Sequence, residues 1–382
     1  MTDNSKLGTV QCSLPLPASR LNGEYRNLTQ VQIEQNIPLA PYTTLRIGGP
    51  ARYFAQATTE ADLIEAITFA RTNDLPLFIL GGGSNLLVSD AGFPGLVLQA
   101  ALAPNALHIA PPINGEITYT VPAGYDWDAF VLATSQAGLT GIESLAGIPG
   151  MVGGSPVQNI GAYGQEVSQT ISAVHALDLE TLTPRTFSRE DCGFAYRTSI
   201  FNSTHRNRYI ITAVEFTFAL AATPTLTYAD LKKHFAATTN PTPLEIYEAV
   251  RAIRRTKGML ILPTDAEPDF RSAGSFFKNP IVPAATLNHI AVALSIAPEK
   301  IPHWPTGPHE IKLPAAWLIE QAGFPKGFTQ GNAAISTCHT LALVNHSGQA
   351  TCADLLALRD TITQKVQSLF EIPLHQEPVY LS

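Results

Sequence analysis

The stretch that decides the fold is GIESLAGIPGMVGGSPVQNIGAYG, residues 141–164. It holds 7 glycines in 24 residues, whereas glycine averages about 7% of residues in proteins. Six apolar residues are interleaved with these glycines: Leu145, Ile148, Met151, Val152, Val157 and Ile160. A surface loop has no need of so many apolar side chains. The pattern therefore predicts a buried, tightly wound segment whose bare backbone is closely approached by another group.

A shorter glycine-rich loop lies upstream, GGGSN at residues 81–85. Apolar runs typical of strands precede and follow it, at Leu77 to Leu80 and at Leu86 to Val88. A Rossmann fingerprint requires a helix after its glycines and a P-loop requires a lysine, so this strand-to-strand loop disfavours both nucleotide folds. Its successive N–H groups can instead form a nest for phosphate oxygens.

Two glycine-rich backbones in one α+β region suit an extended dinucleotide better than a small metabolite. Together with YTTLRIGG, residues 42–49, they indicate a flavin site. Neither glycine-rich stretch contains a His or Cys that the flavin could alkylate. We therefore expect the flavin to be bound non-covalently.

The composition limits the class of protein. With 45% apolar and 14% charged residues the chain is typical of globular proteins, and its 382 residues allow two or three domains. A net charge of -7 predicts no nucleic-acid surface, so an anionic ligand must be held by local cations and N–H groups. Cys12, Cys192, Cys338 and Cys352 are scattered, which predicts neither a disulfide framework nor a metal site. No signal peptide or long uncharged apolar run is present, which predicts a cytoplasmic protein without membrane insertion.

Four helices are expected from capping boxes and apolar spacing. Thr59 opens one with Leu63, Ile64, Ile67 and Ala70 on a single face. The others cover Trp127 to Ala137, Pro243 to Thr256 and the residues after Thr351. The expected division is an N-terminal extension (1–30) followed by three folded segments, 31–100, 101–218 and 219–382.

The motifs carry a resemblance to a known family. TLRIGGPARYF, ILGGGSNLLV, GIPGMVGGSPVQNIGAYG, FAYRTSIF, LTYADL, RRTK and GSFFKNP occur in the order seen in UDP-N-acetylenolpyruvoylglucosamine reductases, over nearly the whole chain after residue 40. GSFFKNP and PxQNIGAYG are highly specific to that family, whereas GGGSN is shared with flavoproteins of the vanillyl-alcohol-oxidase type. The resemblance implies an α+β protein: a PCMH-type flavin fold with subdomains 31–100 and 101–218, then a substrate-binding domain, 219–382.

The resemblance also implies the reaction. NADPH reduces FAD, NADP leaves, and the reduced flavin reduces the enolpyruvyl ether of UDP-N-acetylglucosamine to UDP-N-acetylmuramate, a peptidoglycan precursor. The expected partners are this UDP-sugar and NADPH, and the expected state is a monomer. Hydride arriving at the methylene carbon pushes negative charge onto the carboxylate, and the adjacent carbon then takes a proton. The site must therefore supply a cation and an acid.

The resemblance assigns three residues to this chemistry. Arg197 in FAYRTSIF braces the carboxylate, Ser275 in GSFFKNP donates the proton, and Glu377 assists Arg197. The last of these is less secure, because the family usually ends in a leucine-x-proline-glutamate-valine pattern. This chain reads LHQEPV at residues 374–379, with proline after the glutamate and not before it. The geometry of Glu377 is therefore a question for the structure.

Binding residues follow from the same motifs. Tyr228 resembles the tyrosine of a substrate-covering loop found in one of the two subtypes of the family. Substrate binding is assigned to Tyr228, Arg254, Lys257 and Asn279, with Lys257 and Asn279 near the diphosphate. Cofactor binding is assigned to Arg46, Gly81, Gly82, Gly83, Ser84, Asn85, Gly147, Gly153, Gly154, Ser155, Gln158, Asn159 and Gly161.

Two alternatives remain open on sequence alone. One is a related sugar or alcohol oxidase with non-covalent FAD, although such oxidases commonly tether the flavin through a His near the first glycine loop. The other is a flavin-binding protein without turnover, against which the presence of Arg197, Ser275 and Glu377 argues.

Overall fold

The computed structural model describes residues 31–102, 107–261 and 267–382, so the expected N-terminal extension, residues 1–30, lies outside the described residues. The chain forms two compact units. Among the described residues, unit 1 comprises residues 31–37 together with Ala51–Gly82 and Phe93–Ile253. Unit 2 comprises Pro38–Pro50, Gly83–Gly92 and Arg254–Ser382.

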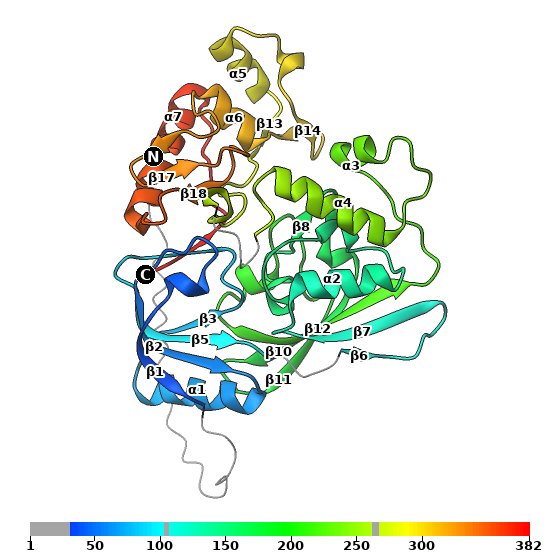
Figure 1. Cartoon of the computed structure of the whole chain (residues 1–382), viewed down its shortest axis with the longest axis vertical. Coiled ribbons are helices and arrows are strands. Elements are labelled where there is room, and N and C mark those ends of the chain that lie inside the picture. Colours follow the sequence, from blue (N-terminus) through cyan, green and yellow to red (C-terminus); the bar gives the residue numbers. More distant parts are fainter. Residues whose placement is uncertain (1–30, 103–106, 262–266) are drawn as a thin grey trace, which may run out of the picture. The chain divides into compact units, whose positions relative to one another are not determined.

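The first part of unit 1 is a four-stranded sheet covered by one helix (Figure 1). The strands lie in the order β1 (Ile33–Pro38), β2 (Pro50–Ala57), β5 (Phe93–Ala100) and β3 (Leu77–Leu80), and β5 runs parallel to both neighbours. Helix α1 (Glu60–Thr72) starts at the predicted capping box of Thr59 and Asp62. Its buried face holds Leu63, Ala66, Ile67 and Ala70, whereas Ile64 is 38% exposed, so the expectation for Ile64 was wrong. Ala66 lies on that face instead, because residues three or four positions apart share one side of a helix.

The second part of unit 1 is a five-stranded antiparallel sheet with the order β11-β10-β12-β7-β6. The elements here are β6 (His108–Ile109), β7 (Glu116–Pro122), α2 (Trp127–Gln136), β10 (Ile171–Asp178), β11 (Pro184–Ser188), η5 (Ile200–Asn202), β12 (Tyr209–Ala219), α3 (Ala229–His234) and α4 (Pro243–Thr256). A cluster of aromatic rings fills the core, in which Phe130 lies 4.8 Å from Phe216 between ring centroids. Helix α4 packs Ile246 and Val250 into the same core, which is why residues 219–253 belong to this unit and not to unit 2.

The stretch 141–164 winds through short 3-10 turns within unit 1. Its elements and those just after it are η2 (Glu143–Leu145), η3 (Val152–Gly154), β8 (Gly161–Ala162), β9 (Gln165–Glu166) and η4 (Val167–Gln169). Leu145 and Val152 are fully buried and the other four interleaved apolar residues are half-buried. The prediction of a packed segment is therefore confirmed.

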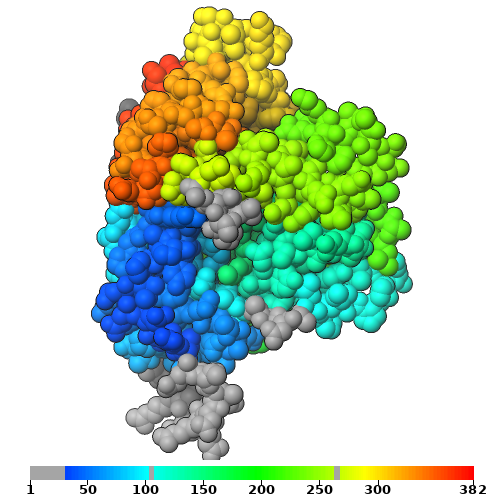
Figure 2. All heavy atoms as spheres, viewed as in Figure 1, coloured from blue at the N-terminus to red at the C-terminus, as the bar shows by residue number. Residues whose placement is uncertain are grey.

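Unit 2 is built from short strands around a long helix. Its elements are η1 (Ala40–Tyr42), β4 (Leu86–Val88), η6 (Pro268–Phe270), β13 (Ile281–Pro283), α5 (Thr286–Leu294), η7 (Pro298–Lys300), β14 (Trp304–Pro305), β15 (Glu310–Lys312), α6 (Ala315–Gln321), β16 (Thr329–Gln330), β17 (Ala333–Ile335), β18 (Leu343–Asn345), α7 (Cys352–Phe370) and β19 (Val379–Leu381). The terminal strand β19 pairs in parallel with β4. Figure 2 shows the yellow segment around α5 as a projection from the rest of this unit.

Most expected elements are present. Leu77 to Leu80, Leu86 to Val88 and Pro243 to Thr256 coincide with β3, β4 and α4, and the helix at Trp127 ends one residue earlier than expected. Within the described ranges no helix is both long and apolar enough to cross a membrane. The same ranges hold no cluster of three or more His, Cys, Asp or Glu side chains suited to a metal ion.

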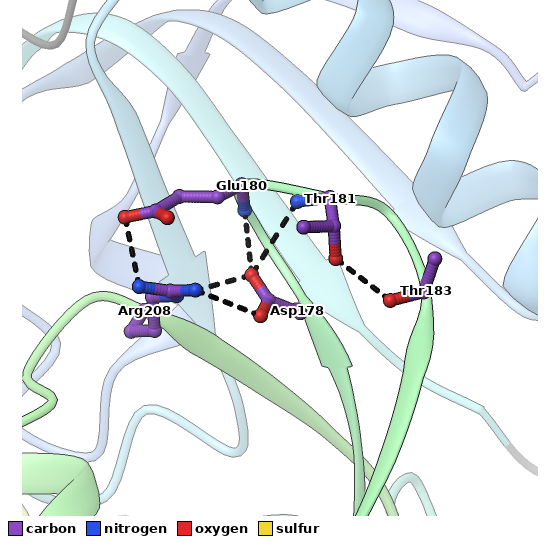
Figure 3. A network of polar contacts seen from close by, with 5 residues as sticks. All are labelled: Asp178, Glu180, Thr181, Thr183 and Arg208. Carbon is purple, nitrogen blue, oxygen red and sulfur yellow. Dashed lines mark hydrogen bonds and ion pairs between the residues drawn. The ribbon is translucent and has the colours of Figure 1, made fainter.

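A buried carboxylate closes the turn between β10 and β11 (Figure 3). Asp178 is 1% exposed, and its Oδ1 accepts hydrogen bonds from the backbone N of Glu180 at 2.8 Å and from Arg208 Nε at 3.1 Å. Arg208 Nη2 donates to Asp178 Oδ2 at 3.0 Å, and its Nη1 lies 2.9 Å from Glu180. These hydrogen bonds, foremost those from Arg208, hold the pKa of Asp178 below its ordinary value.

We expect Asp178→Asn to lower the free energy of unfolding at neutral pH by about 1.5–3 kcal/mol, because charge-assisted hydrogen bonds are lost in a buried turn. The folded pKa of Asp178 lies below 3.8, so its stabilisation is present above that pH and disappears as the pH falls through the folded pKa. Urea unfolding at several pH values should show the difference between the two proteins shrinking below pH about 4. Asp74→Asn, at an exposed position, is the matched control and should leave stability nearly unchanged, and a pH-independent difference for Asp178→Asn would contradict the assignment.

Candidate active site

Within unit 1, Gly82 of the first glycine-rich loop meets the stretch 141–164. A Cβ atom on Gly82 would lie 2.6 Å from the Cα of Gly150. Real Cβ contacts are never that short, so only glycine allows the two backbones to approach so closely. The N–H groups of Gly82, Gly83 and Ser84 donate to no other group among the described residues. Three successive N–H donors of this kind support the predicted nest for phosphate oxygens.

The stretch 141–164 differs from this loop. It offers a ligand a closely packed backbone and a side-chain hydroxyl, and not a row of N–H donors. The N–H groups of Gly153, Gly154 and Ser155 bond to backbone carbonyls at 2.8, 3.0 and 2.9 Å. A Cβ on Gly153 would lie 2.6 Å from the Cβ of Ala123. Ser155 is 1% exposed, and its Oγ is a buried polar atom with no partner in the protein. Buried polar atoms nearly always have a hydrogen-bond partner, so the Oγ of Ser155 can bond to a ligand, and this part of unit 1 fits the predicted flavin.

Asp128 on α2 fixes the predicted cofactor residue Gly147, and sequence reasoning missed it. The backbone N of Gly147 donates to Asp128 Oδ1 at 2.6 Å. Tyr247 and Arg251 on α4 donate to its Oδ2. A single Asp in a helix belongs to no motif, and its partners Tyr247 and Arg251 lie more than 100 residues further along the chain.

Arg197 lies in a tight turn of unit 1. Ala195 and Thr198 exchange backbone hydrogen bonds of 3.0 Å across it, and Arg197 itself has a left-handed φ of 54°. This conformation is costly for a residue with a Cβ, so the surroundings must hold it. The guanidinium Nη2 donates to the carbonyl of Gly161 at 2.8 Å, which places the Arg197 side chain against the end of the stretch 141–164.

Asn159 ties the Arg197 turn to that stretch. Its Nδ2 donates to the carbonyl of Ala195 at 3.1 Å and to Glu166 Oε2 at 2.9 Å, and its Oδ1 accepts from the N of Ser168 at 3.1 Å. The residue is 1% exposed. The side chain is thus engaged within the protein, and the backbone N of Asn159 also donates, to the carbonyl of Pro156 at 3.3 Å.

Ser275 and Glu377 are brought together within unit 2. The N of Glu377 donates to the carbonyl of Phe276 at 2.9 Å, and Phe277 forms a bridge with Gln376. The segment after Ser275 therefore lies antiparallel to the segment that carries Glu377. Asn85 contacts the same place: its carbonyl accepts from the N of Val379 at 2.9 Å, and its Nδ2 donates to the carbonyl of Glu377 at 3.4 Å.

The predicted diphosphate ligands also lie in unit 2. Asn279 Oδ1 accepts from the N of Ala315 at 2.9 Å at the start of α6, so its Nδ2 is the end that can donate to an anion. Lys257 directly follows α4. Arg254 is 9% exposed, and its Nη2 donates to the carbonyl of Met259 at 2.9 Å. This hydrogen bond folds the chain after α4 back on itself.

Between Lys257 and Ser275 the chain contains residues 262–266, which lie outside the described residues. Gly258 lies close to Asp269 and Cys338, since a Cβ on Gly258 would lie 3.2 Å from the Cβ of each. His339 lies nearby with a pKa lowered to about 4 by burial and by the charges of Lys257 and Lys326. It is neutral at physiological pH, and its Nδ1 accepts from the N of Leu341 at 3.1 Å.

Two more predicted residues are exposed. Tyr228 in unit 1 is 42% exposed and makes an edge contact with Tyr163, with ring centroids 5.2 Å apart. Arg46 in unit 2 has a left-handed φ of 55°. Of the other predicted cofactor residues, Gly154 is exposed, and Gly81 and Gln158 are half-buried.

Comparisons with known proteins agree with these features. The family model for the C-terminal domain of UDP-N-acetylenolpyruvoylglucosamine reductase matches residues 265–381, and a model of an FAD binding domain matches residues 51–185. The reductase of Thermobifida fusca is 44% identical over 354 residues, 91% of this chain and 97% of the relative. The chain belongs to the UDP-N-acetylenolpyruvoylglucosamine reductase family.

Further members agree with this assignment. The reductase of Saccharopolyspora erythraea is 42% identical over 89% of this chain and 93% of its own length. The crystal structure of the Thermus caldophilus UDP-N-acetylenolpyruvylglucosamine reductase superposes with a TM-score of 0.58 at 27% identity, covering 92% of this chain and 99% of the other. The predicted family, the α+β flavin fold with its C-terminal domain, and the class of FAD-dependent oxidoreductase are confirmed.

For this reductase we expect Gly82→Ala to weaken FAD binding by about 1–3 kcal/mol, because the added methyl pushes against the backbone of Gly150. Flavin content after purification and the dissociation constant from fluorescence quenching measure the effect. Gly81→Ala is the matched comparison, since its Cβ would meet no atom within 4 Å, and its loss should be smaller. Equal flavin loss in the two variants would show that the close approach does not shape the site.

Proposed function

We propose that this chain is an NADPH-dependent flavoenzyme that reduces UDP-N-acetylglucosamine enolpyruvate to UDP-N-acetylmuramate for peptidoglycan synthesis. The observation that carries the proposal is the hydrogen bond from the N of Glu377 to the carbonyl of Phe276, the residue after Ser275. It supports the proposal because the backbone of Glu377, the predicted helper of Arg197, pairs with the residue next to the predicted proton donor Ser275 in a chain of this reductase family. We further propose a cytoplasmic monomer whose partners are the UDP-sugar and NADPH.

FAD, when bound, supplies the hydride that it receives from NADPH. Its site, in this proposal, is the nest of Gly82, Gly83 and Ser84 together with the shaped stretch that holds Ser155. We also propose that the remaining cofactor residues predicted from the sequence bind FAD. In this proposal residues 31–100 and 101–218 form the flavin subdomains, and residues 219–382 form the substrate domain.

The substrate contacts follow from the chemistry of the groups. Arg197 presents a planar, permanently charged guanidinium to the substrate carboxylate as negative charge develops there. Glu377 assists Arg197 at this carboxylate. Lys257, Arg254 and the Nδ2 of Asn279 supply positive charge and donors for the diphosphate, and Tyr228 covers the bound substrate.

Ser275 gives a proton to the carbon next to the carboxylate. A hydroxyl is a weak acid, but an enolate-like carbon is basic enough to take its proton when the two groups are correctly placed. The backbone around Ser275 is fixed for this purpose by the hydrogen bond from the N of Phe276 to the carbonyl of Leu341, at 2.7 Å.

The function is tested with the purified yellow protein under anaerobic conditions. We expect NADPH to bleach the flavin absorbance and UDP-N-acetylglucosamine enolpyruvate to restore it, with UDP-N-acetylmuramate as the product. Bleaching followed by recovery only with oxygen would favour the oxidase. A flavin that NADPH does not bleach would favour the passive binding protein.

For Ser275→Ala we expect nearly unchanged flavin reduction by NADPH, because that half-reaction protonates no carbon. Reoxidation by the enolpyruvyl substrate should slow by about 10²–10⁴-fold, the usual effect of removing a positioned acid. Ser275→Cys should recover part of the rate, since a thiol also donates a proton. Anaerobic stopped-flow absorbance follows each half-reaction, and equal slowing of both would mean that Ser275 only shapes the site.

A further inference from the structure

Glu377 lies where the chain changes its pairing partner. Before it, Gln376 is bridged to Phe277 in antiparallel fashion. After it, Val379 pairs in parallel with Leu86 as β19 begins beside β4. Pro378 stands between the two pairings and has no N–H to donate. No continuous ladder therefore spans Glu377, although its N donates to the carbonyl of Phe276 and its carbonyl accepts from Asn85 Nδ2. Side chains close to this change of pairing can add to these backbone contacts.

The side chain of Gln376 supplies such contacts. Its Nε2 donates to the carbonyl of Pro378 at 2.7 Å, which closes a short turn with Glu377 at its centre. Its Oε1 accepts from Arg359 Nη1 at 2.9 Å. Both ends of the amide are thus engaged, so the side chain has one orientation only.

Arg359 connects this turn to a rigid element. It lies in the middle of α7, which packs Leu355, Leu358 and Ile362 into the core of unit 2. The Arg359 side chain is 12% exposed, and its Nε and Nη2 both lie 2.7 Å from Asp360 Oδ1. A mostly buried guanidinium held at several atoms keeps its donors in fixed directions.

We propose that Arg359 and Gln376 are positioning residues for Glu377, together forming a side-chain brace that fixes its carboxylate for the substrate. The proposal rests on the proposed function. It also explains the departure of this chain from the family's terminal pattern, which has proline immediately before the glutamate. A proline ring restricts the backbone there directly. In this chain the side chain of Gln376 instead holds the turn through its hydrogen bonds to Pro378 and Arg359.

The test compares Gln376→Leu, Arg359→Met and the double variant of the flavin-loaded enzyme. We expect either single change to slow reoxidation by UDP-N-acetylglucosamine enolpyruvate by about 10–10²-fold, the scale of a small misplacement at a site. Reduction by NADPH and flavin content should stay within about twofold, since Glu377 serves the substrate step. The double variant should be no slower than the slower single variant, because both changes remove one brace.

The control is Gln364→Leu, the same chemical change at an exposed position of α7, which should leave both half-reactions unchanged. Wild-type reoxidation in Gln376→Leu, equal slowing of both half-reactions, or additive effects in the double variant would each overturn the brace. Amide hydrogen exchange over residues 374–382 provides a readout that needs no substrate. Exchange of this segment should be faster in both single variants and unchanged in Gln364→Leu.

Failure of the proposed function is distinguishable from failure of the brace. If the wild-type enzyme is not reoxidised by the enolpyruvyl sugar, the proposed function is wrong and the hydrogen-exchange comparison alone decides on the brace. Unchanged exchange in Gln376→Leu and Arg359→Met would then refute it.

Discussion

The parallel pairing of β19 with β4 is the contact on which the candidate site in unit 2 depends. It joins Val379–Leu381, at the very end of the chain, to Leu86–Val88, directly after the first glycine loop. Just before this pairing, Asn85 accepts from the N of Val379 and donates to the carbonyl of Glu377, so the residue that ends this loop also holds the backbone on both sides of Pro378, directly after Glu377. A loop-closure of almost 300 residues is entropically costly, but its cost grows only slowly with length. The pairing fixes the backbone next to Glu377, one of the catalytic candidates, beside the loop that is proposed to bind the cofactor.

A second constraint is the absence of side chains where backbones meet. Gly82 and Gly150 approach so closely that a single methyl group does not fit between them. Beside this contact, the two stretches have different properties. In the first, three successive N–H groups donate to no group among the described residues, whereas in the second the N–H groups of Gly153, Gly154 and Ser155 bond to backbone carbonyls and the hydroxyl of Ser155 has no partner. Glycine content alone does not distinguish these two situations, although both produce the same sequence signal.

The sequence predicted the elements well because their signals are local. Capping boxes at Thr59 and Thr351 and apolar runs such as Leu77 to Leu80 each depend on a few neighbouring residues. The compact units were not predictable in this way. Helix α4 belongs to unit 1 because Ile246 and Val250 pack there, and this choice is made by tertiary contacts alone. The motif match supplied Arg197, Ser275 and Glu377, but it gave no information on what holds them.

Each of the three catalytic candidates stands on irregular backbone that nearby side chains or long-range backbone pairing immobilise. Asn159 holds the turn of Arg197, and Gln376 with Arg359 holds the turn of Glu377. Irregular backbone can aim a side chain in a direction that a helix or strand does not offer. It also leaves polar groups unpaired unless amide and guanidinium side chains reach them, and in this chain those side chains are largely buried. Each of these turns is thus held within its own unit before substrate arrives, and charged groups on a preorganised backbone stabilise a transition state without reorganising.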